Sequence, residues 1–232
     1  MKRIIIVALT LTILSINLLF AQRDTFESEF YLGAGAGASA SRIDFVPGVP
    51  QTFKIGFQGG LSAKLITQKH LGLLVEANFS QRGWEEEFAA DSDFSYSRTL
   101  NYVEMPFMTH VYFGNRTKFI FNIGPQISFL LNDKQNMSAA LANDIKERQD
   151  ADPEEPIGVQ YKPFDELRRV DYGLIGGIGI EFQTGLGAFD LEGRYYFGLG
   201  DVFESRRSQN AYFGRSAHRI IEAKLTYYIK LR

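Results

Sequence analysis

Residues 98–131 read RTLNYVEMPFMTHVYF, then the break GNRT, then KFIFNIGPQISFLL. Two runs rich in aromatic and β-branched residues flank a polar turn that contains glycine, which is the pattern of a β-hairpin. Each run exceeds the usual strand length of about 5–6 residues. Each is also long enough to cross a bilayer as a tilted strand, which takes about 9–11 residues. We therefore expect a membrane-spanning hairpin, and the same pattern recurs on both sides of it.

The composition narrows the classes of protein that fit. The chain has 232 residues and no cysteine, which excludes disulfides and thiolate metal sites. A formal net charge of -2 gives no reason to expect nucleic acid as a partner. Aromatic residues make up 14% and the mean hydropathy is -0.13. These values fit a barrel in which lipid-facing and lumen-facing residues average out.

Residues 1–21 have the pattern of a secretory signal peptide. Lys2 and Arg3 precede a long apolar run, and the small Ala21 stands at the expected cleavage site. A membrane-spanning helix is the alternative, but the run is slightly short and is interrupted by polar residues. We expect export through a cleaved signal peptide, with 22–232 as a single outer-membrane domain.

Alternation with a period of two predicts strands along the rest of the chain. From Phe30 to Ser41, for example, Leu32 and four alanines share one face, while Tyr31, glycines and serines share the other. The GAGAGAS run in this stretch is not a phosphate-binding loop, because no apolar strand precedes it and no helix follows. The expected strands lie near 30–41, 52–66, 71–84, 98–113, 118–131, 170–183, 188–199 and 217–231.

The connections between these strands alternate in length. TQKH (67–70), GNRT (114–117) and TGLG (184–187) are short, whereas the other connections, near 42–51, 84–96, 132–169 and 200–216, are long. Outer-membrane barrels have an even number of strands, short periplasmic turns and long extracellular loops. We therefore predict an all-β fold, a transmembrane antiparallel up-and-down β-barrel of about eight strands. A soluble lipocalin-like barrel, apolar inside and polar outside, is the competing architecture.

Several stretches resemble the PorT-like outer-membrane β-barrel family of Bacteroidota, also described as porin family proteins. The order of the motifs carries the resemblance: GFQGGLSAKLITQKHLGLLVEANFSQRGWEE, LNYVEMPFMTHVYFG, KFIFNIGPQISFLL, YGLIGGIGIEF and FDLEGRYYFGLGDVF. The resemblance implies a barrel in the outer membrane of a Gram-negative cell. It also raises a role in the type IX secretion system, in which the family's namesake is implicated. The family offers no agreed catalytic residues to transfer.

With the apolar face toward lipid, the opposite face carries many charges of both signs. This inward set comprises Lys54, Lys64, Glu76, Arg82, Glu104, Lys118, Glu181, Asp190, Glu192, Arg194, Glu222, Lys224 and Lys230. Buried charges must pair, and an eight-stranded barrel is just wide enough for side chains to fill. We expect an ion-pair network that fills the lumen. The alternative is a polar permeation path or a proton-handling carboxylate cluster.

An outer-membrane enzyme acting on lipid or peptide is a hypothesis of another class. Such a site needs a base near a serine or an acid. His70 and His110 are expected at the periplasmic end, and His218 near the outer rim beside Asp201, Ser205 and Ser216. We expect His218 to be a solvated rim residue. We assign no catalytic, cofactor-binding or metal-ligating residue and expect a non-enzymatic protein.

The acidic segment 132–169 is the best candidate for a binding surface. It carries Asp133, Asp144, Glu147, Asp150, Asp152, Glu154, Glu155, Asp165 and Glu166. These oxygens could hold Ca²⁺, although the spacing matches no known loop, and a solvated loop is the simpler interpretation. Residues 137–148 predict a short helix capped by Asn136. The expected partners are outer-membrane lipid and proteins of a secretion system; the ligand is not specified by the sequence.

The opening hairpin contains one irregularity. Pro106 and Pro125 interrupt its strands, and proline cannot donate to a ladder. A two-residue turn at Asn115-Arg116 would also place Glu104 on the lipid side. We therefore predict a turn with an odd number of residues, 114–116, or a bulge at one of the prolines.

Overall fold

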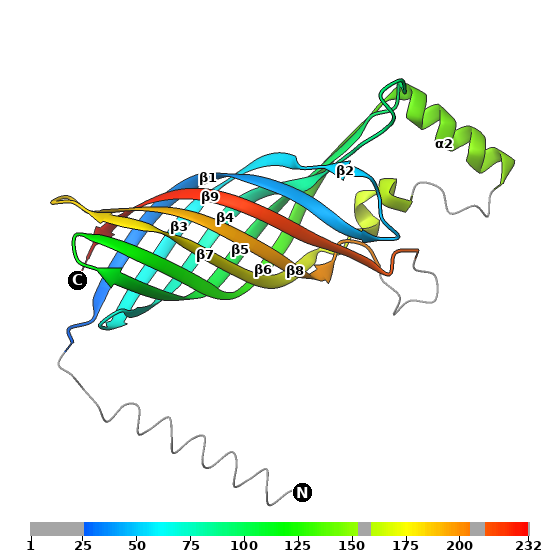
Figure 1. Cartoon of the computed structure of the whole chain (residues 1–232). Coiled ribbons are helices and arrows are strands. Elements are labelled where there is room, and N and C mark those ends of the chain that lie inside the picture. The colour runs from blue at the N-terminus through cyan, green and yellow to red at the C-terminus, as the bar shows by residue number, and fades with distance from the viewer. Residues whose placement is uncertain (1–25, 153–158, 205–211, 232) are drawn as a thin grey trace, which may run out of the picture.

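The computed structural model describes residues 26–152, 159–204 and 212–231. The expected signal peptide, residues 1–21, lies outside this range. Figure 1 shows one closed barrel of long tilted strands, with an arm that projects from one end and carries a helix at its tip. None of the helices in the described ranges combines the length and hydropathy needed to cross a membrane.

The strands are longer than the sequence predicts. Their bounds are β1 Glu29–Val46, β2 Gln51–Thr52, β3 Lys54–Gln68, β4 Leu71–Glu86, β5 Tyr96–Gly114, β6 Thr117–Met137, β7 Val170–Gln183, β8 Ala188–Asp201 and β9 Arg215–Lys230. The helix α2 spans Ala139–Ala151, and two 3₁₀ turns, η1 Val159–Tyr161 and η2 Phe164–Glu166, follow it.

The sheet closes on itself. Each long strand pairs antiparallel with its sequence neighbours, and β1 pairs with β9 from Tyr31↔Lys230 to Val46↔Arg215. The tiny β2 adds to the outer end of β4. The start of β1 and the C-terminus lie at the same end, with the short turns (Figure 1). By the rule for outer-membrane barrels this end is periplasmic and the arm is extracellular. The predicted up-and-down barrel of about eight strands is confirmed.

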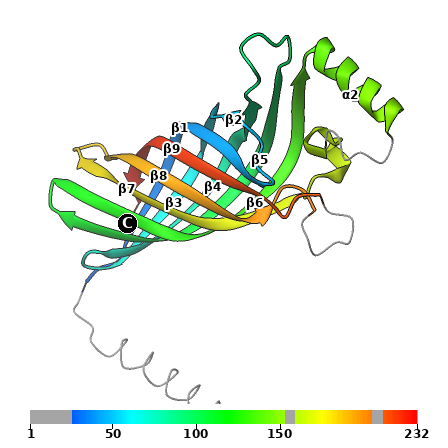
Figure 2. The same cartoon turned by 45° about the vertical axis from the view of Figure 1, so that its right-hand side comes forward.

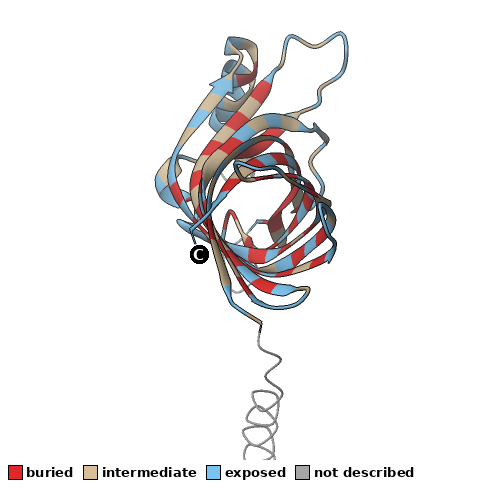
Figure 3. Cartoon of the chain, turned by 90° about the vertical axis from the view of Figure 1, so that its left-hand side faces the viewer, coloured by how far each residue is buried: buried red, intermediate tan, exposed pale blue. Residues whose placement is uncertain are grey.

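The two faces of the wall differ in the way that a membrane requires. Figure 3 shows buried and exposed residues alternating along the ribbons. Large apolar side chains point outward, among them Leu61, Phe119, Ile178, Leu191 and Leu225. Polar and charged side chains are buried inside. This is the opposite of a lipocalin, so the soluble alternative is wrong.

The β5–β6 hairpin confirms one part of its prediction and corrects another. Gly114 pairs with Lys118, so the turn holds three residues, 115–117, one position later than predicted. The odd count pairs Glu104 with Ser128 and keeps Glu104 inside. No bulge lies at the prolines; the register shifts instead between Asn101 and Tyr102.

Residues 132–152, the first part of the segment 132–169, form more regular structure than the sequence predicts. β6 runs on to Met137 and pairs with the outer end of β5, beyond the point where β7 joins at Phe129. Polar residues suffice there, because this part of the strand has no lipid to face. The helix follows, and its cap is Ser138, whose Oγ accepts a hydrogen bond from Leu141 N, rather than the predicted Asn136.

Placing a charge on the lipid-facing wall tests the assigned facing. The side chain of Ile178 is exposed on the outer face of β7, so Ile178→Arg is expected to destabilise the folded barrel in vesicles by about 2–4 kcal/mol. Urea unfolding followed by the fluorescence of the single tryptophan, Trp84, measures this. Leu186→Arg, in the exposed 184–187 turn, is the matched control and should change stability by less than about 1 kcal/mol. Equal effects would contradict the assigned facing.

Candidate functional site

Strand alternation carries the inward charges into the lumen, where most are completely buried. The buried members are Lys64, Glu76, Arg82, Glu104, Glu181, Asp190, Glu192, Arg194, Glu222 and Lys224. Lys54 and Lys118 are partly covered, whereas Lys230 lies at the exposed periplasmic end. The prediction that inward charges fill the barrel with ion pairs is therefore confirmed for most of the set.

The middle of the lumen is organised around Arg194 of β8. Its guanidinium donates to both carboxylate oxygens of Glu76 at 2.8 and 2.9 Å and to Glu192 at 2.7 Å. Lys224 of β9 adds hydrogen bonds of 2.7 Å to Glu76 and 3.0 Å to Asn78. The cluster joins β4, β8 and β9 across the lumen, so it ties opposite walls together.

A second cluster lies nearer the extracellular end, around the fully buried Arg82. Arg82 donates to Asp171 at 2.9 Å and to Glu104, and Tyr196 donates to the same Asp171 oxygen at 2.9 Å. The Arg82 guanidinium also lies 4.9 Å from the ring centre of Tyr196. Sequence analysis missed Asp171, although it shares the alternation of Glu181 along the same strand and could have been found that way.

The third cluster fills the periplasmic half. Lys64 pairs with Glu181 and, at 3.1 Å, with Asp190, while Lys118 pairs with Glu181 at 2.7 Å. The Lys64 ammonium lies 4.0 Å from the ring centre of Tyr228. Glu222 differs from these carboxylates. It accepts a hydrogen bond from the side-chain amide of Gln58 at 2.8 Å, and no ion pair is recorded for it within the described residues.

An apolar plug closes the extracellular mouth above these clusters. Phe203 and Phe213, from the ends of the β8–β9 connection, fold inward against Phe45 and Trp84. The ring centres of Phe45 and Phe213 are 4.8 Å apart, and those of Phe45 and Trp84 are 5.5 Å apart. Leu100, Tyr102 and Leu130 of the wall complete the packing. Together, the charged lumen and the plug leave the interior occupied by side chains.

The histidines do not form the arrangement that an enzyme hypothesis requires. His218 was expected to be solvated at the rim, but it is fully buried in the lumen and contacts the hydroxyl of Tyr102 at 3.3 Å. His218 shares the alternation of the inward Glu222 and Lys224 on β9 and could have been placed inside in that way. Asp201 accepts a hydrogen bond from the Ser216 backbone at 2.7 Å, and Ser216 Oγ accepts one from Phe203 N. These contacts fasten β8 to β9.

The two other histidines lie where the sequence placed them. His110 is buried in the periplasmic half and contacts Asn122 at 2.7 Å. His70 occupies the β3–β4 turn with a φ of 74° and contacts the carbonyl of Tyr112 at 2.9 Å. Ser205 lies outside the described residues.

The carboxylates of the 132–169 segment do not converge on one point in the described ranges. Asp133 accepts a hydrogen bond from Arg98 at 2.8 Å, Asp165 pairs with Arg169, and Glu166 pairs with Lys162. No group of three or more potential metal ligands is found in the part of the chain that the structure describes. The Ca²⁺ hypothesis therefore has no support there; Glu154 and Glu155 lie outside that part.

A cleft of about 280 Å³ opens at the base of the arm. Glu85, Glu86, Phe88, Phe94 and Tyr96 contribute to its lining. The hydroxyl of Tyr161 donates to Glu86 Oε2 at 2.7 Å. Burial raises the pKa of the Glu86 carboxyl, and burial together with this hydrogen bond raises the pKa of Tyr161. The cleft combines aromatic surface with carboxylates.

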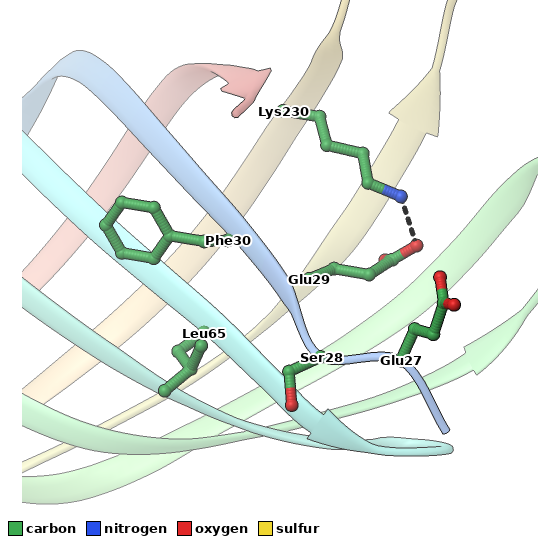
Figure 4. A pocket seen from close by; sticks show the side chains of 6 residues that line it. All are labelled: Glu27, Ser28, Glu29, Phe30, Leu65 and Lys230. Carbon is green, nitrogen blue, oxygen red and sulfur yellow. Dashed lines mark hydrogen bonds and ion pairs between the residues drawn. The ribbon is translucent and has the colours of Figure 1, made fainter. Parts of the chain in front are cut away.

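A second recess, of about 680 Å³, lies at the periplasmic end beside the start of β1. Figure 4 shows Glu27, Ser28 and Glu29 along it, with Lys230 of β9 donating to Glu29. This ion pair joins β1, the first strand of the barrel, to β9, the last. The Leu231 N–H also donates to the carbonyl of Phe30 at 2.8 Å. The recess belongs to the closure of the barrel.

The fold and its lumen agree with a comparison of the sequence against known families. Residues 20–204 match the model described as outer membrane protein beta-barrel domain. The chain belongs to this family. It is a small outer-membrane β-barrel protein of the eight-strand type, located in the cell outer membrane. No curated protein sequence matches the chain.

Solved structures with a similar fold are remote in sequence. Neisserial surface protein A is 12% identical, with a TM-score of 0.47, covering 89% of this chain and 100% of its own. OprG from Pseudomonas aeruginosa is 8% identical, with a TM-score of 0.48, covering 88% and 96%. The outer membrane enzyme PagL is 12% identical, with a TM-score of 0.39, covering 86% and 98%.

Removing the central cation tests whether the lumen network stabilises this outer-membrane barrel. Arg194→Met leaves Glu192 without its ion pair and Glu76 with Lys224 alone, so we expect a loss of about 3–5 kcal/mol. Urea unfolding from vesicles measures it. Arg116→Met, in the exposed periplasmic turn, removes the same charge and should change stability by less than about 0.5 kcal/mol. Similar losses in both variants would contradict a structural role for the network.

Proposed function

We propose that this protein is a non-enzymatic outer-membrane anchor whose extracellular arm is a docking platform for a protein partner. The observation that carries the proposal is the filled interior: ion pairs and the aromatic plug occupy the lumen that a transport path would need. Without a transport path, binding takes place on the outer surfaces. The arm, which Figure 2 shows projecting from one end of the barrel, is one of these.

The internal contacts of the arm support a fixed platform rather than a loose loop. Arg98 is fully buried at its base and donates to Asp133 and, at 2.8 Å, to the carbonyl of Lys162. The ring centres of Tyr96 and Tyr161 are 4.4 Å apart. Leu141 of α2 is buried in the same apolar cluster as the plug. The arm is therefore an extension of the barrel core.

The cleft at the base of the arm suggests the chemistry of the partner. Its carboxylates, Glu85 and Glu86, stand beside the aromatic rings of Phe88 and Phe94. The adjoining loop adds Glu87, Asp91 and Asp93. A segment with a cationic side chain among apolar ones complements such a surface. Association with a type IX secretion complex is the more specific form of this proposal, and it rests on the PorT-like resemblance.

Electrical recording tests the filled interior. Reconstituted protein in planar bilayers is expected to give no stable, large conductance, because the lumen charges are paired and a general diffusion pore needs roughly 16 strands. Reproducible porin-sized steps would contradict this. Heat-modifiable migration of the same preparation shows that the barrel is folded when the recording is made.

Site-specific crosslinking in intact cells tests the platform. A photo-crosslinking residue in place of Glu147, exposed on α2, is expected to give a discrete adduct with a protein, which mass spectrometry identifies. The same residue in place of Gly48 is the matched control, because that site is exposed, open and at the same end of the barrel. Equal adducts at both sites, or none from Glu147, would contradict the proposal. An adduct with a secretion-system subunit would support its more specific form.

A deletion separates the platform from the anchor. Removing residues 134–161 takes away α2, η1 and the last four residues of β6 but leaves the other strands whole. The shortened protein is expected to keep heat-modifiable migration and to lose the crosslinked partner. Loss of that migration would show that the barrel needs the arm to fold.

A further inference from the structure

The lipid-facing wall changes character abruptly at the extracellular end of the β1–β9 seam. Up to Ala40 on β1 and Ile221 on β9 the outward residues are apolar. The next outward residues are Arg42 and Arg219, which are direct cross-strand partners. The Asp44–Ala217 pair comes next, and Arg215 stands two levels further out than Arg219, opposite Val46. Three guanidinium groups therefore stand at the edge of the apolar belt, where outer-leaflet headgroups begin.

Arg42 and Arg215 leave positive charge accessible at this edge, whereas Arg219 is buried beside them. Arg219 donates to the carbonyls of Gly198 and His218 at 2.9 and 2.8 Å and to Asp44 at 3.0 Å, so it is fixed in the wall. Arg215 shares the same Asp44 oxygen at 3.4 Å. The exposed Arg42 has no ion pair recorded within the described ranges and lies 5.3 Å from the ring centre of Phe53. Within the described ranges, Asp44 is the one carboxylate recorded in an ion pair with these cations.

The wall directly below this cluster is shaped differently from its surroundings. The outward residues of β1 are Ala34, Ala36, Ala38 and Ala40. Their cross-strand partners include large exposed side chains, Leu61, Phe57 and Ile55 on β3 and Leu225 and Ile221 on β9. The apolar surface is therefore lowest along β1, in a strip that leads to Arg42.

We propose that the Arg42–Arg215–Arg219 cluster binds the phosphate groups of an outer-leaflet glycolipid of the lipid A type, with acyl chains along the alanine strip. Arginine matches phosphate geometry with two parallel hydrogen bonds. The excess of two positive charges complements a phosphorylated sugar headgroup, and the strip offers apolar surface to the chains of the same molecule. The proposal is independent of the arm and its partner.

The test uses the full exported chain, delipidated in detergent micelles and titrated with defined lipids under native mass spectrometry. Bis-phosphorylated lipid A is expected to bind the wild-type protein at least tenfold more tightly than dephosphorylated lipid A. The double variant Arg42→Gln with Arg215→Gln is expected to weaken binding of bis-phosphorylated lipid A about tenfold. It should leave the dephosphorylated form unchanged. Arg219 is kept because it braces the β8–β9 wall.

A matched control removes the same charge at the other end of the barrel. Lys69→Gln with Arg116→Gln changes two exposed turn residues and should keep lipid A affinity within twofold of wild type. Phosphatidylglycerol titration identifies general attraction to anionic lipid. The proposal is overturned if the double variant keeps its affinity, if the control variant loses as much, or if phosphatidylglycerol binding falls equally. Heat-modifiable migration confirms that each variant is folded.

A second variant tests the alanine strip. Ala38→Leu raises the lowest part of the wall between Phe57 and Ala223 without touching a charge. Both forms of lipid A should then bind about threefold more weakly, because the acyl chains lose their place. Unchanged binding of both forms would overturn the acyl-chain part of the proposal.

Discussion

The pairing of β1 with β9 is the constraint on which the structure depends. A sheet edge exposed to hydrocarbon leaves backbone donors and acceptors unsatisfied at several kcal/mol each. The seam removes that edge along sixteen paired residues, from Tyr31 to Val46. Small residues let the two strands approach, since a Cβ at Gly37 would lie 2.1 Å from the carbonyl oxygen of Ala223. Closure with this strand number then fixes a lumen that side chains can fill.

Because charged side chains occupy the lumen, their pairing depends on the register of every strand. Sliding one strand by a single residue would move its inward charges to the lipid side. Glu76 and Arg194 show the consequence: they meet across the lumen from β4 and β8, so their bidentate pair forms only when the intervening strands keep their registers. The ion pairs therefore select one arrangement of the wall.

The sequence predicts the parts of the fold that depend on local periodicity. Alternation identified the strands, the facing of Lys64 or Arg82, and the odd turn after Gly114. It could not reveal which charges meet, because partners such as Arg82 and Asp171 lie 89 positions apart and depend on the tilt of every strand between them. His218 was expected in solvent because it was assigned to the rim, although it continues the inward alternation of Glu222 and Lys224 on β9. The arm was missed because beyond the membrane β6 has no apolar face to mark it.

The occupied lumen is also the reason that we expect partner binding at the extracellular surface. A barrel strand can continue beyond the membrane only while a neighbour pairs with it, and β5 and β6 do so for each other out to Tyr96 and Met137. Each strand pairs the backbone groups on their shared edge without lipid or lumen, so their side chains are free to vary. At the seam the opposite holds: Arg219 is tied to the wall by carbonyls of β8 and β9, and its charge is held at a fixed depth. The two proposed sites therefore differ physically: the arm presents variable side chains to a protein partner, and the seam holds a charge at the depth of a lipid headgroup.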